Sequence, residues 1–198
     1  MTTSVLTRPR VRVAAVLLVL AVGIAGVLVW RLGEDPVAPY DDARSSGRIT
    51  LCLAGERVTG GKLDERPFAD VVLGSTGLPE GTDPSGAVAT LFAYQPREGV
   101  GPEEFSGSPI TAAVAFADPA RPATRVTKEA WTLQDFVTAF PADLDGYVQL
   151  RLVLGTPAGG TLADHYDTAD VRVDGDSWEL VGGGDASCVD AGKAVSGS

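Results

Sequence analysis

The chain contains no asparagine, one histidine and two cysteines among its 198 residues. Without asparagine it has no N-glycosylation acceptor, which requires the pattern Asn-x-Ser/Thr. Structural zinc sites use four cysteine or histidine ligands, and three such residues in total are too few. Lysine and isoleucine occur only three times each, while alanine, glycine, valine, aspartate and arginine abound. This composition is typical of a high-GC bacterium.

Clusters of basic residues are also missing. All 26 acidic residues lie after Trp30, together with 13 of the 16 basic residues, so residues 31–198 carry a net charge of −13 with histidine neutral. Nucleic-acid binding needs a basic surface that neutralises phosphates, and single basic residues scattered among acids do not supply one. The same charge opposes docking on anionic lipid head groups. The sequence therefore predicts no nucleic-acid partner and a solvated acidic surface.

One long apolar run is present. Residues 13–30 are uncharged and follow Arg8, Arg10 and Arg12, and a helix of this length spans about 27 Å, close to the hydrocarbon thickness of a bilayer. The positive-inside rule then predicts a cytoplasmic segment 1–12, a transmembrane helix that contacts the lipid bilayer, and a C-terminal part outside the cell membrane. A cleaved secretory signal is the alternative, but the run exceeds a signal core and no small-x-small site ends it.

The two cysteines, Cys52 and Cys188, both lie in the part predicted to be outside the membrane, where a disulfide persists once formed. We expect them to form one, because nothing else in the sequence engages them. In the chain-entropy interpretation, closing a loop this long would stabilise the fold by about 5 kcal/mol. The bond would also place the two ends of the domain side by side.

Segment 31–47 combines proline, acids and small residues without apolar periodicity, which predicts a flexible linker. The domain is expected at residues 48–190, followed by a disordered tail at 191–198. Its apolar runs are short and separated by Gly, Pro and Asp, as in a protein built of many strands. The predicted strands are Ile49–Ala54, Ala69–Leu73, Ala87–Tyr94, Ile110–Ala117, Tyr147–Leu154, Ala169–Val173 and Ser177–Val181.

Side-chain alternation predicts how two of these strands are buried. In Tyr147–Leu154, valine and leucine alternate with Tyr147, Gln149 and Arg151, so this strand should have one face in water. In Ile110–Ala117 both faces are apolar or small, so both could be buried.

The C-terminal strands give the clearest local signal. Asp174-Gly175-Asp176 separates them as a short glycine-containing loop, which predicts a hairpin. Trp178 and Leu180 would then face the core.

One segment allows two interpretations. Helical spacing behind Thr132-x-x-Asp135, a capping-box pattern, favours a short helix, and the residues with this spacing are Leu133, Phe136, Val137 and Phe140. Against that, the stretch 136–147 followed by Val-Gln-Leu-Arg-Leu resembles bacterial immunoglobulin-like or fibronectin-type domains. In those domains a Pro-containing turn and a Gly-Tyr pair join one strand to a long central strand. This resemblance implies a strand here, and we favour the strand.

The strand pattern as a whole predicts an all-β fold. We expect a single immunoglobulin-like β-sandwich ectodomain preceded by one transmembrane helix. The immunoglobulin pattern of an inter-sheet cysteine pair with a tryptophan between is not reproduced, because Cys188 follows the last predicted strand. The strand order is therefore left unassigned.

Catalytic patterns are scarce in this sequence. His165 lies between predicted strands beside Asp164, Asp167 and Asp170. There is no Gly-x-Ser-x-Gly nucleophile elbow, and the acids do not follow the spacing of a calcium loop. We expect a solvated surface loop here. The sequence assigns no catalytic, cofactor-binding or metal-ligating residue. The one pair of residues to which it assigns a role is Cys52 and Cys188, as a disulfide.

Two carboxylate chemistries are alternatives to this interpretation. The triplet Asp167-Thr168-Ala169 resembles the active-site triplet of retroviral-type aspartic proteases, in which paired subunits bring two carboxylates together to share a proton. The apolar strand that precedes the triplet in those proteases is missing. Paired carboxylates for glycoside hydrolysis stay open, because their separation depends on the fold.

These features predict a membrane-anchored extracytoplasmic binding or interaction module, without a cofactor, that contacts an envelope protein or polymer through its loops. The alternatives are an extracytoplasmic carboxylate-dependent hydrolase and an accessory subunit of a membrane complex. A deep cleft with two facing carboxylates would favour the hydrolase, whereas shallow loops without convergent polar groups would favour the module.

Overall fold

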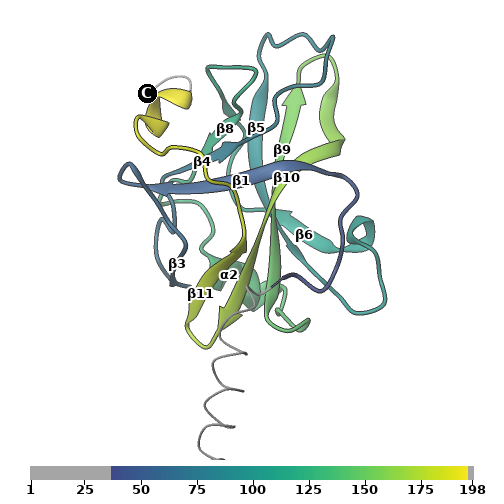
Figure 1. The fold of residues 1–198 in the computed structure, drawn as a ribbon, viewed down its shortest axis with the longest axis vertical. Helices are drawn as coiled ribbons and strands as arrows, with labels where there is room; N and C mark the ends of the chain where they lie inside the picture. Colours follow the sequence, from purple (N-terminus) through teal and green to yellow (C-terminus); the bar gives the residue numbers. More distant parts are fainter. Residues whose placement is uncertain (1–36, 196–198) are drawn as a thin grey trace, which may run out of the picture. The chain divides into compact units, whose positions relative to one another are not determined.

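Figure 1 shows the computed structural model, in which the structure describes residues 37–195. The predicted cytoplasmic segment 1–12, the predicted span 13–30, the first part of the predicted linker and residues 196–198 lie outside the described residues. Within the described residues no helix has the length and apolar character needed to cross a membrane.

Eleven short strands and one α-helix make up the regular structure of the described part, together with two 3₁₀ turns. The strands are β1 (Ser45–Leu53), β2 (Glu56–Arg57), β3 (Gly60–Lys62), β4 (Val71–Gly74), β5 (Val88–Gln95), β6 (Ser106–Pro109), β7 (Val114–Ala115), β8 (Ala123–Arg125), β9 (Tyr147–Thr156), β10 (Gly160–Asp174) and β11 (Ser177–Gly182). The helix is α2 (Leu133–Ala139), and the turns are η1 (Pro102–Glu104) and η2 (Ala191–Ala194). The predicted all-β class is confirmed.

The strands follow the order β6-β5-β9-β10-β1-β4-β8, and β1 joins two groups of them. The first part of β1, through Arg48, pairs parallel with β10, and the second part, from Ile49 to Cys52, pairs antiparallel with β4. Figure 1 shows β1 lying across β9 and β10 at a steep angle, with β4 and β8 beyond it. The sheet is therefore mixed, and β1 carries the chain from one group of strands to the other.

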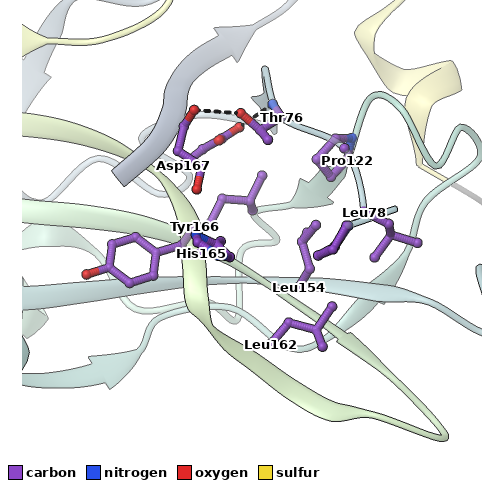
Figure 2. A pocket seen from close by; sticks show the side chains of 12 residues that line it. Thr76, Leu78, Pro122, Leu154, Leu162, His165, Tyr166 and Asp167 are labelled. Carbon is purple, nitrogen blue, oxygen red and sulfur yellow. Dashed lines mark hydrogen bonds between the residues drawn. The ribbon is translucent and has the colours of Figure 1, made fainter. Parts of the chain in front are cut away.

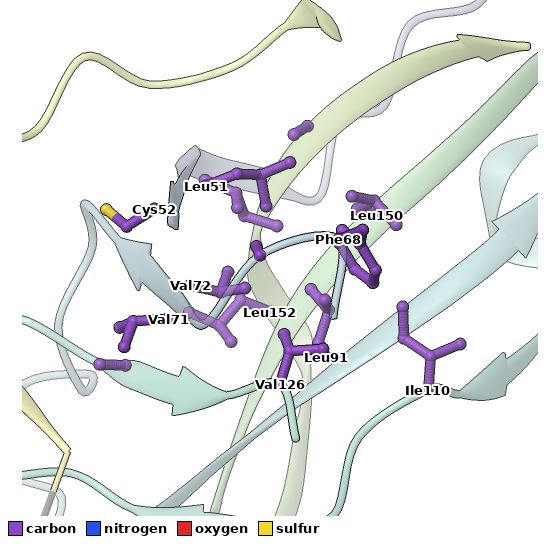
Figure 3. Packing of buried hydrophobic residues seen from close by; sticks show 14 of the residues in the cluster. Leu51, Cys52, Phe68, Val71, Val72, Leu91, Ile110, Val126, Leu150 and Leu152 are labelled. Carbon is purple, nitrogen blue, oxygen red and sulfur yellow. The ribbon is translucent and has the colours of Figure 1, made fainter. Parts of the chain in front are cut away.

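The core lies between these two groups. Leu51 from β1 and Val72 from β4 pack toward Leu91, Leu150 and Leu152 from β5 and β9, and all five side chains are almost fully buried (Figure 3). Alternation explains the pattern, since every second residue of these strands is apolar and points inward. The two groups of strands are thus held together by one shared core.

The C-terminal hairpin is confirmed. β10 and β11 pair antiparallel, with Val173 opposite Trp178 and Asp174 opposite Ser177. Gly175 adopts a positive φ of 59° in the connecting turn, a conformation that glycine reaches without steric cost. Trp178 is buried as predicted, at 3% exposure.

The Cys52–Cys188 disulfide is also confirmed, with a Cα–Cα distance of 5.5 Å. It ties β1 to the segment that follows β11. Beyond it, part of the predicted disordered tail is ordered: the η2 turn packs on the domain, and Val195 is buried and forms a β-bridge with Phe116. The C-terminal end of the domain therefore extends at least to Val195.

The favoured strand at 136–140 is wrong, because the segment forms the helix α2. The hydroxyl of Thr132 accepts the Asp135 N–H, and the Asp135 carboxylate accepts the Thr132 N–H, so the capping box is complete. Leu133 and Phe136, three residues apart, are both fully buried on one helix face. The local pattern was the better guide, and the resemblance misled the assignment.

The predicted strand Ile110–Ala117 is largely wrong as well. Only Val114–Ala115 pairs as a strand, while β6 precedes the predicted range and pairs with β5. The chain leaves the ladder at Thr111, whose hydroxyl accepts the N–H of Leu91. All four alanines of the segment are exposed, namely Ala112, Ala113, Ala115 and Ala117.

Candidate functional site

Residues 37–44, here called the strap, lie against the polar face of β9 and β10. The hydroxyl of Tyr147 donates to the carbonyl of Val37 at 3.1 Å, and that of Tyr40 donates to Asp170 Oδ1 at 2.5 Å. Tyr166 donates to both carboxylate oxygens of Asp42, at 2.9 and 3.1 Å. These residues belong to the predicted linker, but they are fastened to the domain.

The strap also explains why the predicted water-exposed face of β9 is wrong. The face of β9 expected to lie in water is dry, because Tyr147, Gln149 and Arg151 are only 6%, 1% and 4% exposed. Tyr40 packs edge-on against Tyr147 and against Phe105. Burial of this polar face therefore depends on a segment more than one hundred residues earlier in the chain.

Arg151 lies at the centre of the buried polar face. Its guanidinium carbon is 4.0 Å from the ring centroid of Tyr94 and 4.6 Å from that of Tyr166. Nε donates to Gln149 Oε1 at 2.6 Å, and Nη2 donates to the carbonyl of Pro102 at 2.8 Å. Nη2 also lies 3.6 Å from Asp42 Oδ2. Protein groups on several sides engage the guanidinium, so we assign it to fastening the strap.

The ionisable groups under the strap respond to burial in a consistent way. Burial raises the pKa of Tyr40 and the pKa of Tyr166, so that both hydroxyls stay protonated and can donate to carboxylates. Burial also raises the pKa of Asp170, although the Tyr40 hydroxyl and the charges of Arg48 and Arg151 oppose the shift.

Substitution of Asp170 by asparagine should therefore raise the free energy of unfolding relative to wild type by an amount that depends on pH. Because the pKa of Asp170 is raised, the folded protein binds the Asp170 proton more tightly than the unfolded chain does. Proton binding at Asp170 therefore stabilises the wild-type fold fully below the ordinary pKa of 3.8, and this stabilisation is lost as the pH rises through the raised pKa. Asparagine cannot ionise and still accepts from Tyr40. The stability of Asp170→Asn relative to wild type should increase between pH 3 and pH 7 in urea unfolding. A difference that is constant with pH would contradict the assignment.

The candidate binding site is an apolar pocket of about 250 Å³ at the end of the core. It adjoins the strap through Tyr166, which lines the pocket and donates to Asp42. Leu152, Leu154 and Leu162 come from the β9–β10 hairpin, and the loop after β4 covers them (Figure 2). The lining residues are Ser46, Thr76, Gly77, Leu78, Pro79, Pro122, Leu152, Leu154, Leu162, His165, Tyr166 and Asp167. Leu152 and Leu154 also belong to the core, so the pocket is a hollow extension of it.

His165 is on this pocket, although its predicted setting was wrong. It lies within strand β10 and not in a loop, and it is exposed. Its imidazole has no hydrogen bond or ion pair among the described residues. Asp164 is exposed as predicted. The imidazole is therefore free to contact a molecule that enters the pocket.

Asp167 and Asp170 are not solvated loop acids, which corrects the prediction. Asp167 is 3% exposed and Asp170 is 7% exposed. Asp167 Oδ2 accepts the N–H groups of Ser75 and Thr76 at 2.5 and 2.9 Å, while its Oδ1 is buried without a hydrogen-bond partner. The carboxylate that suggested a protease triplet thus holds the loop that forms the wall of the pocket.

Two alanine substitutions three residues apart should separate these roles. Asp167→Ala removes the acceptor for two backbone N–H groups and is expected to lower the free energy of unfolding by about 1–3 kcal/mol. Asp164→Ala, on an exposed side chain of the same strand, should change it by no more than about 0.5 kcal/mol. Chemical denaturation of both variants and wild type measures the difference. Equal effects would show that the amide contacts of Asp167 do not stabilise the loop.

The remaining acids of interest lie in turns. Asp145 has a positive φ of 51° just before Gly146, and Asp176 forms an exposed ion pair with Lys62 at 2.8 Å. Within residues 37–195 no group of three or more His, Cys, Asp or Glu side chains is placed to hold a metal ion.

Sequence reasoning missed the pocket because its lining comes from separate segments. One local indication was Leu162, an apolar residue outside every predicted strand. In the structure it pairs with Leu154 across the β9–β10 hairpin. Nothing local indicated that the loop at 76–79 and Pro122 would face these leucines.

Comparison of the chain with protein-family models, with curated proteins and with solved structures found no significant match.

Proposed function

We propose that the chain is a membrane-anchored extracytoplasmic binding module that holds an apolar ligand in the pocket at the end of its core. The observation that supports this is a hollow lined by four leucines and two prolines that reaches the surface at His165. Binding sites of small molecules are typically concave, mostly apolar and supplied with a few polar groups. This pocket has that composition.

The arrangement of the acids favours binding over hydrolysis. Asp42 is engaged by Arg151 and Tyr166, Asp170 by Tyr40, and Asp167 by two backbone amides. A glycosidase needs two carboxyl groups about 5–9.5 Å apart across an open cleft. Asp167 is the one carboxylate among the pocket's lining residues.

The membrane anchor belongs to the same proposal. Its support is the uncharged run 13–30 behind three arginines and the acidic part that follows. The full chain should stay in the membrane fraction at full mass, with residues 37–195 open to protease from outside. Recovery of a soluble form that begins beyond residue 30 as the main species would contradict the anchor and leave the binding site untouched.

We further propose an immunoglobulin-like arrangement for the domain. Support comes from two groups of antiparallel strands that share one core and are bridged by the strand β1. The disulfide differs from the immunoglobulin pattern, since Cys188 follows β11 instead of lying within a strand.

The binding site can be tested with cyclohexanol, a small neutral apolar probe, added to the full chain in lipid nanodiscs. Methyl NMR signals of Leu78, Leu154 and Leu162 should shift and saturate with probe concentration. Leu162→Trp fills the pocket and should abolish saturable binding. Ala163→Trp places the same side chain on the neighbouring exposed residue, which does not line the pocket, and should preserve it.

Two results would overturn the proposed site. One is a wild-type protein whose leucine methyl signals do not respond. The other is saturable binding that Leu162→Trp leaves unchanged, because the probe would then occupy some other part of the molecule.

A further inference from the structure

We propose that the pocket selects a ligand with an aliphatic chain and a neutral or cationic polar end, and that it discriminates against an anionic end. This inference rests on the proposed function, because it takes the pocket as the binding site. It adds the chemical class of the ligand.

The apolar part of the ligand follows from the lining. Leu154 and Leu162 are paired across β9 and β10, and Leu78 and Pro122 face them from loops on the other side (Figure 2). All four side chains are aliphatic. Phe and Trp are absent from the residues that line the pocket. The aromatic residue that does line the pocket, Tyr166, points its hydroxyl away, toward Asp42. An aliphatic chain fits such a surface through contact area alone.

The polar groups gather at one end of the pocket. Figure 2 shows Asp167 and Thr76 together at one end and Leu162 at the other. Ser46 belongs to the polar end as well, since its carbonyl accepts the Thr76 hydroxyl at 3.0 Å. One polar end on an otherwise apolar hollow indicates a ligand with a single polar group at the end of its chain.

The charge at that end decides which polar group is favoured. The lining contains one carboxylate, Asp167, and neither lysine nor arginine. Residues 31–198 add a net charge of −13 with histidine neutral. An anionic ligand group would approach Asp167 without a compensating cation, whereas an ammonium or a hydroxyl group would not be repelled. The free His165 imidazole at the rim can accept a hydrogen bond from either of these donors.

The test uses the full chain in nanodiscs at pH 8, with free ligand concentrations measured by dialysis. Along the series from 1-butanol to 1-octanol, each added methylene should lower the dissociation constant about fourfold until the pocket is full. Octylammonium and 1-octanol should bind more tightly than octanoate, and added salt should reduce the preference for octylammonium. Leu162→Trp should abolish saturable binding of all of them.

A charge variant makes the test specific. Ser46 is exposed and lies at the polar end, so Ser46→Lys should strengthen octanoate binding and weaken octylammonium binding. Ala112→Lys adds the same charge at an exposed position that does not line this pocket, and should leave the order of affinities unchanged.

The outcomes separate the two proposals. If cyclohexanol binds in the pocket but octanoate is the tightest of the three octyl ligands, or chain length has no effect, the ligand class is wrong while the binding site stands. If cyclohexanol does not bind in the pocket, the proposed function fails and this inference fails with it.

Discussion

Replacement of Arg151 by methionine is expected to lower the free energy of unfolding by about 3–5 kcal/mol. Methionine preserves much of the side-chain volume but removes the cation beside Asp42, whose side chain is 6% exposed. The buried carboxylate then keeps two neutral donors, the Tyr166 hydroxyl and the Arg44 N–H, and no positive charge. It also removes the donors to Gln149 Oε1 and to the carbonyl of Pro102. Unpaired buried charge is among the most destabilising of single changes.

Urea unfolding of the full chain, followed by tryptophan fluorescence to which the buried Trp178 contributes, measures this effect. Lys62→Met is the matched control, because it breaks an exposed ion pair with Asp176 and should change the free energy of unfolding far less than Arg151→Met. If Arg151→Met costs no more than Lys62→Met, the strap does not depend on the buried cation.

Removal of the disulfide is expected to have an effect of similar size. The variant with both Cys52→Ala and Cys188→Ala should lose about 2–5 kcal/mol, since the bond closes a sequence separation of 136 residues and restricts the unfolded chain. Both positions are buried, and alanine avoids leaving a free thiol. The disulfide also holds the segment leading to η2 beside β1.

Reduction of the wild-type protein supplies an independent comparison for the same quantity. Its midpoint of urea unfolding should move close to that of the double variant. A double variant as stable as the oxidised wild type would show that the core alone holds the two ends of the domain together.

The parts of the fold that could be predicted are those set by nearby residues. Strands β1, β5, β9 and β11 were predicted from short apolar runs separated by Gly, Pro and Asp, and the hairpin at Gly175 from its turn residue. The disulfide followed from two cysteines in the part of the chain predicted to lie outside the membrane, where a disulfide persists. Helix α2 also had a local signal in its capping box, and a loose resemblance outweighed it.

The parts that could not be predicted depend on distant segments. Gln149 and Arg151 alternate with apolar residues as in a strand that has one face in water, but both are buried. No residue near them in the sequence indicates that the strap covers this face. Asp167 and Asp170 lie in a polar stretch that resembles an exposed loop, but the partners that bury them come from residues 75–76 and from Tyr40. The pocket is missed for the same reason, because it exists only where separate segments meet.

Under the proposed membrane anchor, the strap also limits the length of free chain between the transmembrane helix and the domain. A linker of residues 31–47 could extend about 60 Å, but contacts from Val37 onward leave only residues 31–36 between the proposed transmembrane helix and the domain. Six residues extend to about 20 Å at most. Under the proposed anchor, the strap therefore shortens the chain between the transmembrane helix and the first fastened residue, Val37, from the 17 residues 31–47 to the six residues 31–36.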